Sequence, residues 1–438
     1  MPIAMIESLD AEGRGVARAD GKAVFVEGAL PGETVEYETL RSRPTYEQAR
    51  AVRILRESAL RVQPRCPHFG VCGGCSNQHL DFAAQAAVKQ RVMEDAFWHI
   101  ARLRPEVIYP AMAGQAWGYR QRARLGVRKV PSKGGVLVGF HEKNSSYIAD
   151  LSVCPVLPPH VSAMLPRLRT LVEGLSIADR VPQVELVMGE CEGREPVTVL
   201  VFRHLLPFSG ADLKRLRSFA EAEEVSVWGQ PGQPSSARPL MGDDSELIYY
   251  SLPEFDVRVA HRPGDFTQVN VHANRLLVHR AMQLLDPAPG ERIGDLFCGL
   301  GNFALPIARQ GASVVGMEGS AAMAARATAN ARANGLAERA VFHAADLFET
   351  TEDSFAALGA FDKLLLDPPR EGAIAVAKSI EMGSDPRRIV YVSCNPATLA
   401  RDAAVLVREK GYVLRGAGVI NMFAQTSHVE SVALFERP

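Results

Sequence analysis

No stretch of the sequence is apolar for long enough to cross a membrane as a helix. The first ten residues also lack the basic region and apolar core of a secretory signal, so we expect a cytoplasmic location. An excess of one charge is missing too: 49 basic and 50 acidic residues give a formal net charge of −1, without a global basic signature for nucleic acid. The 438 residues, 47% of them hydrophobic, have the composition of a globular protein of roughly two or three domains.

Cysteine is scarce, with seven in the chain. In a cytosolic protein such residues indicate metal ligands or catalytic groups before disulfides. Cys66, Cys72 and Cys75 follow a C-x5-C-x2-C pattern, and Cys154 is a fourth candidate. Four thiolates suit either an iron–sulfur cluster or a structural zinc ion, and the spacing alone does not decide between them.

A further cysteine, Cys394, stands where a strand is predicted to end and a helix to begin. The apolar run 389–392 precedes it, while Asn395 and Pro396 suit the N-cap and the first position of a helix. The positive end of the helix dipole should favour the thiolate, which is a strong nucleophile. The competing interpretation is a small residue packed at a strand end, because free cysteine is often buried.

The chain divides into three segments by its pattern. Residues 1–58 contain short alternating strands and turn signals, which predict a small β-barrel. Residues 59–264 are mixed α and β and contain the cysteine group. Residues 265–438 repeat strand, loop and helix, which predicts a doubly wound parallel sheet.

The first segment resembles a TRAM domain, an OB-like RNA-binding module. The resemblance lies in Leu-Asp-Ala-Glu-Gly-Arg-Gly-Val-Ala-Arg at 9–18 and Val-Glu-Gly-Ala-Leu-Pro-Gly-Glu at 26–33. It implies that this segment binds RNA.

The middle segment has a local excess of positive charge. Residues 102–133 contain eight basic side chains and one acidic side chain. Arg120, Arg122 and Arg124 recur with a period of two, which places them on one face of a strand. Guanidinium groups pair with phosphates, so this strand is a candidate RNA-binding element. A solvated charged strand is the alternative.

A glycine loop follows the first strand of the third segment. It runs from Asp295 to Ala304 as Asp-Leu-Phe-Cys-Gly-Leu-Gly-Asn-Phe-Ala, and Glu318 closes the next strand 19 residues after Gly299. A carboxylate at this spacing meets the ribose hydroxyls of a nucleotide cofactor. The loop resembles the first motif of class I methyltransferases, which favours S-adenosylmethionine over NAD.

Methylation at carbon 5 of a uracil requires one activated cysteine and one base. A thiolate added to carbon 6 makes carbon 5 nucleophilic toward a methyl sulfonium, and the carbon 5 proton must then leave. Cys394 would supply the thiol. Glu430, on the last predicted strand, is the candidate base, with an exposed strand glutamate as the alternative. Asp367, followed by two prolines, should point into the cleft at the carboxyl end of the sheet.

Five motifs occur in the order of the RNA uracil-5 methyltransferases, and the sequence resembles that family over nearly its whole length, most of all the bacterial 23S ribosomal RNA branch. The motifs lie at 266–270, 295–303, 366–370, 392–402 and 428–431. The resemblance implies Cys394 as the nucleophile and Glu430 as the base. It implies S-adenosylmethionine contacts from Gln268, Phe297, Asn302, Glu318, Asp346 and Asp367.

The same resemblance favours a [4Fe–4S] cluster on Cys66, Cys72, Cys75 and Cys154. It implies a class I, Rossmann-like methyltransferase domain at 265–438, behind a TRAM barrel and a mixed α/β iron–sulfur central domain. The expected function is the formation of 5-methyluridine in 23S ribosomal RNA by a monomer that needs no membrane.

Three alternatives remain. The same chemistry on the T-loop uridine of tRNA is the nearest. An RNA-binding iron–sulfur protein with an inactive methylase domain would not need Cys394, Asp367 and Glu430. A cytosine-5 RNA methylase would carry a second cysteine after the Asp-Pro position, where this chain has Pro369 and Arg370.

Overall fold

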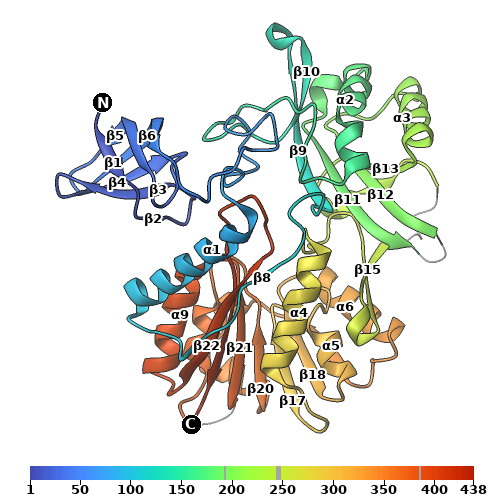
Figure 1. Cartoon of the computed structure of the whole chain (residues 1–438). Helices are drawn as coiled ribbons and strands as arrows, with labels where there is room; N and C mark the ends of the chain where they lie inside the picture. Colours follow the sequence, from blue (N-terminus) through green and yellow to red (C-terminus); the bar gives the residue numbers. More distant parts are fainter. Residues whose placement is uncertain (192–193, 243–247, 384–385) are drawn as a thin grey trace.

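A computed structural model of the chain describes residues 1–191, 194–242, 248–383 and 386–438. The described residues form three separate sheets. Figure 1 shows the N-terminal sheet at the left, the central sheet at the upper right and the largest sheet below both. Within the described ranges, every helix is too short or too polar to span a membrane.

The N-terminal sheet has six strands in the order β1-β5-β6-β4-β3-β2. β1 and β2 are consecutive pieces of one segment, yet they pair with strands at opposite ends of that order. The segment therefore closes the sheet into the small barrel that the alternating pattern predicts, around buried residues such as Val24 and Val35. The strands are β1 (Ile3–Met5), β2 (Ser8–Leu9), β3 (Gly15–Ala19), β4 (Lys22–Glu27), β5 (Thr34–Ser42) and β6 (Tyr46–Arg56).

The central sheet has the main order β10-β9-β11-β12-β13-β14, with β15 joining β11 to β16. Helices α2 (Pro159–Glu173) and α3 (Gly210–Glu223) share one apolar core with this sheet. The mixed α and β character agrees with the pattern of this segment. The strands are β9 (Arg122–Val130), β10 (Gly135–Gly139), β11 (Gln183–Cys191), β12 (Arg194–Arg203), β13 (Val225–Gln230), β14 (Arg238–Pro239), β15 (Ile248–Leu252) and β16 (Val257–His261).

The largest sheet has the order β19-β18-β17-β20-β21-β23-β22-β7, with β8 also paired to β22. β19, β18, β17, β20 and β21 run parallel, as the strand–loop–helix repeat predicts, whereas β23 is antiparallel to both neighbours. The strands are β7 (Val107–Ile108), β8 (Met112–Ala113), β17 (Arg292–Leu296), β18 (Ser313–Glu318), β19 (Ala340–Ala344), β20 (Lys363–Leu366), β21 (Arg388–Ser393), β22 (Val413–Asn421) and β23 (Glu430–Glu436).

Helices cover both faces of this sheet, and two large apolar cores result. The strand order reverses between β17 and β20, and ligands of doubly wound sheets bind at such a point. The helices are α1 (Phe82–Ala96), a π-helical turn (Phe97–Ala101), α4 (Val271–Leu285), α5 (Ala304–Arg309), α6 (Ala321–Ala333), α7 (Glu352–Ala356), α8 (Ile374–Ser379) and α9 (Pro396–Arg408).

Residues 82–113 lie early in the sequence but belong to the layers of the largest sheet. Helix α1 packs on α9 and β22, and β7 and β8 pair with β22. In Figure 1 the blue α1 crosses in front of the red strands near the C-terminus. A segment from the first quarter of the chain is therefore placed beside strands from its last tenth.

Candidate active site

The loop after β17 has the backbone shape that a close ligand requires. Gly299 and Gly301 have φ of +56° and +93°, and a Cβ on Gly301 would lie 3.1 Å from the side chain of Leu305. The carboxylate of Glu318 accepts hydrogen bonds from the backbone N–H of Gly299 at 3.1 Å and of Ser320 at 2.9 Å. Glu318 is therefore fixed at the carboxyl end of β18, where the sequence places it.

All six residues predicted to contact S-adenosylmethionine line one cavity of about 900 Å³, which we call the cofactor cavity. Its volume lies in the range of small-molecule sites. The six residues come from the ends of β17, β18, β19 and β20 and from the segment before α4. They are Gln268, Phe297, Asn302, Glu318, Asp346 and Asp367.

Two residues that the sequence did not single out hold Asn302 in place. The hydroxyl of Tyr250 donates to Asn302 Oδ1 at 2.9 Å, and Asn274 exchanges two hydrogen bonds with the same side chain at 2.8 and 3.0 Å. Tyr250 comes from the central sheet and Asn274 from α4. Their sequence surroundings give no signal, because the contacts exist only after the sheets have packed together.

Cys394 lies at the junction of β21 and α9, as the sequence predicts. The side chain of Asn395 is the N-cap of α9 and accepts a hydrogen bond from the N–H of Ala397. The thiol lines the cofactor cavity and is partly exposed.

The surroundings of Cys394 oppose the effect that the helix dipole is predicted to have on its thiol. Burial, together with the negative charges of Glu430 and Asp367, raises the pKa of the Cys394 thiol to about 11. Arg370 acts in the opposite direction and lowers that pKa. The residues that surround a catalytic thiol can thus outweigh one helix end.

Glu430 begins β23 and lies opposite Cys394. Ser431 pairs with Ser393 across β23 and β21, so the preceding Glu430 and the following Cys394 meet at the same edge of the sheet. The side chain of Glu430 is only 2% exposed, which overturns the alternative of an exposed strand glutamate. Burial and the nearby Asp367 raise its pKa well above the ordinary value, while Lys89 opposes that rise. Burial also raises the pKa of Asp367 to about 7.

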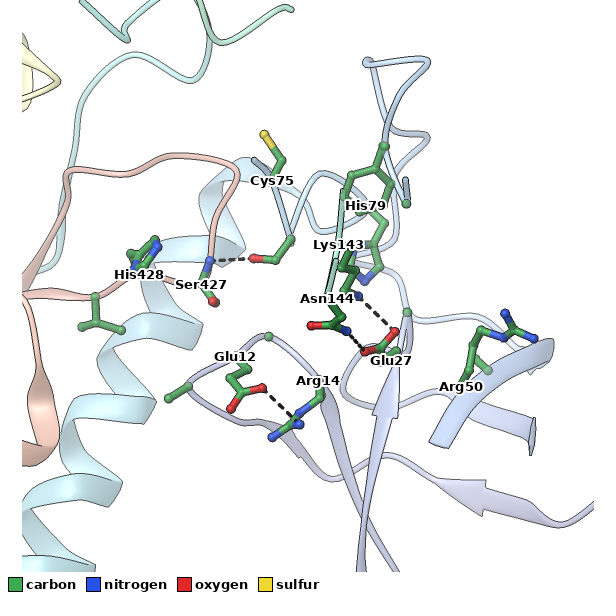
Figure 2. Close-up of a pocket in the computed structure, with 18 of the residues that line it drawn as sticks. Glu12, Arg14, Glu27, Arg50, Cys75, His79, Lys143, Asn144, Ser427 and His428 are labelled. Atoms are coloured by element: carbon green, nitrogen blue, oxygen red, sulfur yellow. Dashed lines mark hydrogen bonds and ion pairs between the residues drawn. The ribbon is translucent and has the colours of Figure 1, made fainter. Parts of the chain in front are cut away.

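A second cavity, of about 750 Å³, reaches Cys394 from the side of the N-terminal barrel. We call it the basic groove. Figure 2 shows its walls, where Lys143 and Asn144 both bond Glu27 of β4. Six basic side chains line it, namely Arg14, Arg50, Arg53, Arg61, Lys143 and Arg370.

The two cavities share Cys394, Arg370 and His428. Arg370 Nη2 lies 3.3 Å from His428 Nδ1. A substrate base from the basic groove and a small cofactor from the cofactor cavity would therefore meet at the thiol. The basic groove was not predicted, because its residues come from all three sequence segments.

The predicted arginine strand divides into two parts. Arg122 is 9% exposed and pairs with Glu185 at 2.7 Å, and Arg124 lies 3.4 Å from the same carboxylate. Glu185 balances one of these two positive charges, and Arg122 serves the packing of β9 on β11 while Arg124 stays exposed. Arg120 precedes the strand, stacks over Phe140 and lines the cofactor cavity.

The four predicted metal ligands Cys66, Cys72, Cys75 and Cys154 line one small cavity together. Burial raises the pKa of Cys75 to about 12 and that of Cys154 to about 11. Over the ranges that the structure describes, no group of three or more His, Cys, Asp or Glu side chains is gathered for a metal ion.

Residues 66–79 contain Cys66, Cys72 and Cys75, and we call them the cysteine loop. This loop is hydrogen-bonded to the segment 422–429, which we call the active-site loop. The N–H groups of Ser76 and Asn77 both donate to the carbonyl of Gln425, and Ser76 Oγ accepts from the N–H of Ser427. The buried side chain of Gln85 in α1 bonds Gln425 Oε1 and the carbonyl of Asn77. The cysteine loop thus holds the chain that leads into Glu430.

Two family profiles match the chain. The profile described as tRNA (uracil-5-)-methyltransferase matches residues 84–438. The TRAM domain profile matches residues 4–52, which confirms the TRAM resemblance of the first segment.

Similar proteins match over the whole length. The 23S rRNA (uracil(1939)-C(5))-methyltransferase RlmD of Azoarcus sp. (strain BH72) is 69% identical over 438 residues, covering 100% of both chains. The protein of the same name from Cupriavidus pinatubonensis is 57% identical and covers 100% of this chain and 96% of its own.

One solved structure shares the fold over the full chain. The crystal structure of Pyrococcus abyssi tRNA (uracil-54, C5)-methyltransferase in complex with S-adenosyl-L-homocysteine has a TM-score of 0.74 and 24% identity. The match covers 99% of this chain and 100% of that one. It confirms the combination of an N-terminal β domain with a methyltransferase sheet.

Proposed function

The chain belongs to the tRNA (uracil-5-)-methyltransferase family, and we propose that it methylates carbon 5 of a uridine in 23S ribosomal RNA, using S-adenosylmethionine. The names of the relatives specify uracil 1939, and we propose the same base for this chain. The observation that carries the proposal is the meeting of the two cavities at Cys394, with Glu430 opposite it across β21 and β23. We also propose that the enzyme acts in the cytoplasm, where it would meet ribosomal RNA. We propose that it acts as a monomer, because the residues of the proposed site all belong to one chain.

The residues of the site match the needs of the reaction. The Cys394 thiolate adds to carbon 6 of the uracil, and the electron pair of the 5,6 double bond makes carbon 5 a nucleophile. S-adenosylmethionine, when bound, supplies the methyl group that carbon 5 takes.

Glu430 then removes the proton from carbon 5. The electrons of that C–H bond re-form the 5,6 double bond, and the bond from carbon 6 to sulfur breaks with its pair returning to Cys394. The register of β21 and β23 supports this role, because it brings Glu430 to the same sheet edge as Cys394.

We propose that Gln268, Phe297, Asn302, Glu318, Asp346 and Asp367 hold S-adenosylmethionine in the cofactor cavity. Glu318 is oriented by two backbone donors, which leaves its carboxylate at the strand end where ribose hydroxyls bind. Asn302 is oriented by Tyr250 and Asn274. Asp346 lines the same cavity and caps a short helical turn through the N–H of Phe348.

We also propose that Cys66, Cys72, Cys75 and Cys154 hold a [4Fe–4S] cluster with a structural role. All four line one cavity, and Cys72 Sγ accepts an N–H bond from Gly74 at 3.4 Å. A single zinc ion with Zn–S bonds of about 2.3 Å would draw the sulfurs to roughly 3.8 Å from one another. A cluster takes one thiolate per iron and suits sulfurs that are spread around a cavity.

The resemblance to the uracil-5 methyltransferases is what favours the cluster over zinc. A brown protein with broad visible absorption and about four irons per chain is the expected result. A colourless protein with one zinc ion would contradict it.

One experiment tests the substrate and the reaction together. The protein is incubated with radiolabelled S-adenosylmethionine and either unmodified 23S ribosomal RNA or unmodified tRNA, and the labelled base is mapped. Label in 5-methyluridine of 23S ribosomal RNA alone is the expected result. Label in the tRNA T-loop would replace the ribosomal substrate, and label in 5-methylcytidine would overturn the reaction.

A further inference from the structure

A lysine is buried behind the site. Lys89 of α1 is 1% exposed, and its Nζ donates to Asn421 Oδ1 at 2.6 Å and to the carbonyl of Phe423 at 2.8 Å. Asn421 follows Ile420, which pairs with Glu430 across β22 and β23. These bonds fix the ammonium group beside the start of β23. Lys89 is not among the residues that line either cavity.

The charged groups around Glu430 are unevenly balanced. Cys394 faces it from the end of β21, and Asp367 from the end of β20. Arg370 and His428, from the neighbouring loops, line the cofactor cavity with it. The charges acting on the Glu430 carboxyl come from Asp367, which disfavours its ionised form, and from Lys89, which favours it.

We propose that Lys89 is a positioning residue of the methylation reaction, whose buried ammonium stabilises the ionised form of Glu430, the form that can take the proton from carbon 5. The inference rests on the proposed role of Glu430 as the base. A carboxyl group that is already protonated cannot accept this proton, so the covalent adduct of RNA and Cys394 would persist after methyl transfer. Proton removal is thus the step that needs Lys89.

The energetic cost of the arrangement supports a role beyond packing. Burying an ammonium is unfavourable, and burial lowers the pKa of Lys89 to about 7, with Glu430 acting in the opposite direction. Burial and Asp367 raise the pKa of Glu430. Each of the two groups therefore stabilises the charged form of the other. A methionine of similar length would pack at position 89 without the cost of a buried charge.

The test measures two steps of one turnover in Lys89→Met. Rapid mixing with 23S ribosomal RNA and labelled S-adenosylmethionine gives the rate of methyl transfer, and denaturing gels give the decay of the RNA–protein adduct from pH 6 to pH 9.5. We expect methyl transfer within about twofold of the unmodified protein. Adduct decay should have its pH midpoint raised by about one unit and be about tenfold slower at pH 7.

Two further variants test the proposal even if Lys89→Met does not fold. Asn421→Asp preserves volume, neutralises Lys89 by direct pairing, and should shift the midpoint in the same direction. Lys363→Met removes another buried lysine, 4% exposed and bonded to Glu291 at the opposite end of the sheet, and should not delay adduct decay. An unshifted midpoint in a folded Asn421→Asp protein, or an equal delay in Lys363→Met, would overturn the inference.

Glu430→Gln separates this inference from the proposed function. If this variant does not accumulate the adduct, Glu430 is not the base and both proposals fail. If it accumulates the adduct while Lys89→Met decays like the unmodified protein, only the role of Lys89 fails.

Discussion

At the scale of single residues, burial and nearby negative charges affect the pKa values of the site more strongly than the helix dipole does. Burial disfavours the ionised forms of Cys394, Asp367 and Glu430 and raises the pKa of each, and the negative charge of Asp367 adds to the rise at Cys394 and at Glu430. A loaded site changes this balance, since a sulfonium brings positive charge into the cofactor cavity. At neutral pH, the raised pKa of Cys394 favours its thiol form.

The first prediction concerns the nucleophile itself. Cys394→Ala should abolish both the RNA adduct and methylation, because the Cys394 thiol lines both cavities and is the proposed nucleophile. Binding of S-adenosylmethionine, measured by calorimetry, should stay within about twofold, since the thiol lines only the edge of the cofactor cavity. Residual methylation above a buffer control would refute the covalent route.

The second prediction concerns the pH dependence of adduct formation. With a pKa of about 11, the thiolate fraction of Cys394 rises with pH, so the rate should increase about tenfold per unit between pH 6 and pH 8. Arg370 lowers that pKa, and Arg370→Ala should therefore slow adduct formation at pH 7 by about tenfold. Stopped single-turnover reactions check both. A rate that does not depend on pH would show that the thiol is activated in another way.

At the scale of elements, the start of α9 fixes both the nucleophile and the arginine. Asn395 caps the helix through its Oδ1, and its Nδ2 donates to the carbonyl of Arg370 at 2.9 Å. Thr398 Oγ1 donates to the same carbonyl at 3.2 Å. One helix end thus connects the loop after β20 to the thiol after β21.

The third prediction separates these two functions of Asn395. Asn395→Ala should lower the free energy of unfolding by about 1 kcal/mol, the usual cost of a lost N-cap, and should also slow adduct formation. Asn395→Asp retains the cap but loses the amide donor to Arg370. It should keep most of the stability and share the slower adduct formation. Denaturant titrations and single-turnover rates of both variants provide the comparison, and equal rates for all three proteins would contradict it.

At the scale of the whole molecule, the active-site loop is held by segments from the start of the chain. Gln85 of α1 is fully buried and bonds the carbonyls of Asn77 and Leu80 and the side chain and N–H of Gln425. These bonds connect the cysteine loop, α1 and the chain leading to Glu430. The site therefore depends on contacts between residues about 340 positions apart.

The fourth prediction tests this connection. Gln85→Met should lower the free energy of unfolding by about 3 kcal/mol, because it leaves several buried backbone and amide groups without partners. Gln90→Met on the same helix removes one bond to Glu94 near the surface and should cost only about 0.3 kcal/mol. Thermal unfolding of the two variants decides the matter. Similar losses for both would mean that the buried network contributes little.

The fifth prediction concerns the ion pair between Glu33 and Arg61, which connects the barrel to the residues that follow it. Glu33 is fully buried and accepts from Arg61, which also bonds the carbonyl of Gly28. Burial alone would raise the pKa of Glu33, but the bonds from Arg61 and from the N–H of Leu30 outweigh it, and the pKa is lowered. Arg61→Ala should cost about 3 to 5 kcal/mol by leaving a buried carboxylate unpaired, whereas Ala at the exposed Arg56 should cost about 0.5 kcal/mol or less.

The sign of the pH effect follows from the lowered pKa of Glu33. Its stabilising contribution is fully present above the pKa of the unfolded chain and is lost as pH falls through the lower folded value. Denaturant titrations between pH 3 and pH 7 should show this loss in the unmodified protein and not in Arg61→Ala. A parallel loss in both proteins would assign the acid sensitivity to other groups.

The sequence by itself determined the local features of this protein. The apolar runs and glycine loop of the third segment predicted parallel strands, and β18 ends at Glu318 and β21 contains the run 389–392, as predicted. Cys394, Glu318 and Asp367 also carry short-range signals, since each stands at or beside a predicted strand end, whereas the family resemblance implied Gln268, Phe297, Asn302 and Asp346. Such signals depend only on neighbouring residues, so they can be recognised in the amino-acid sequence.

Only the tertiary structure decided which groups act on one another. The order of the strands brings Glu430 opposite Cys394, and α1 carries Lys89 to the same place from the first quarter of the chain. The basic groove forms between three segments, and the thiol pKa depends on charges from separate strands. Burial and charge proximity arise through packing between distant residues, which no local pattern encodes.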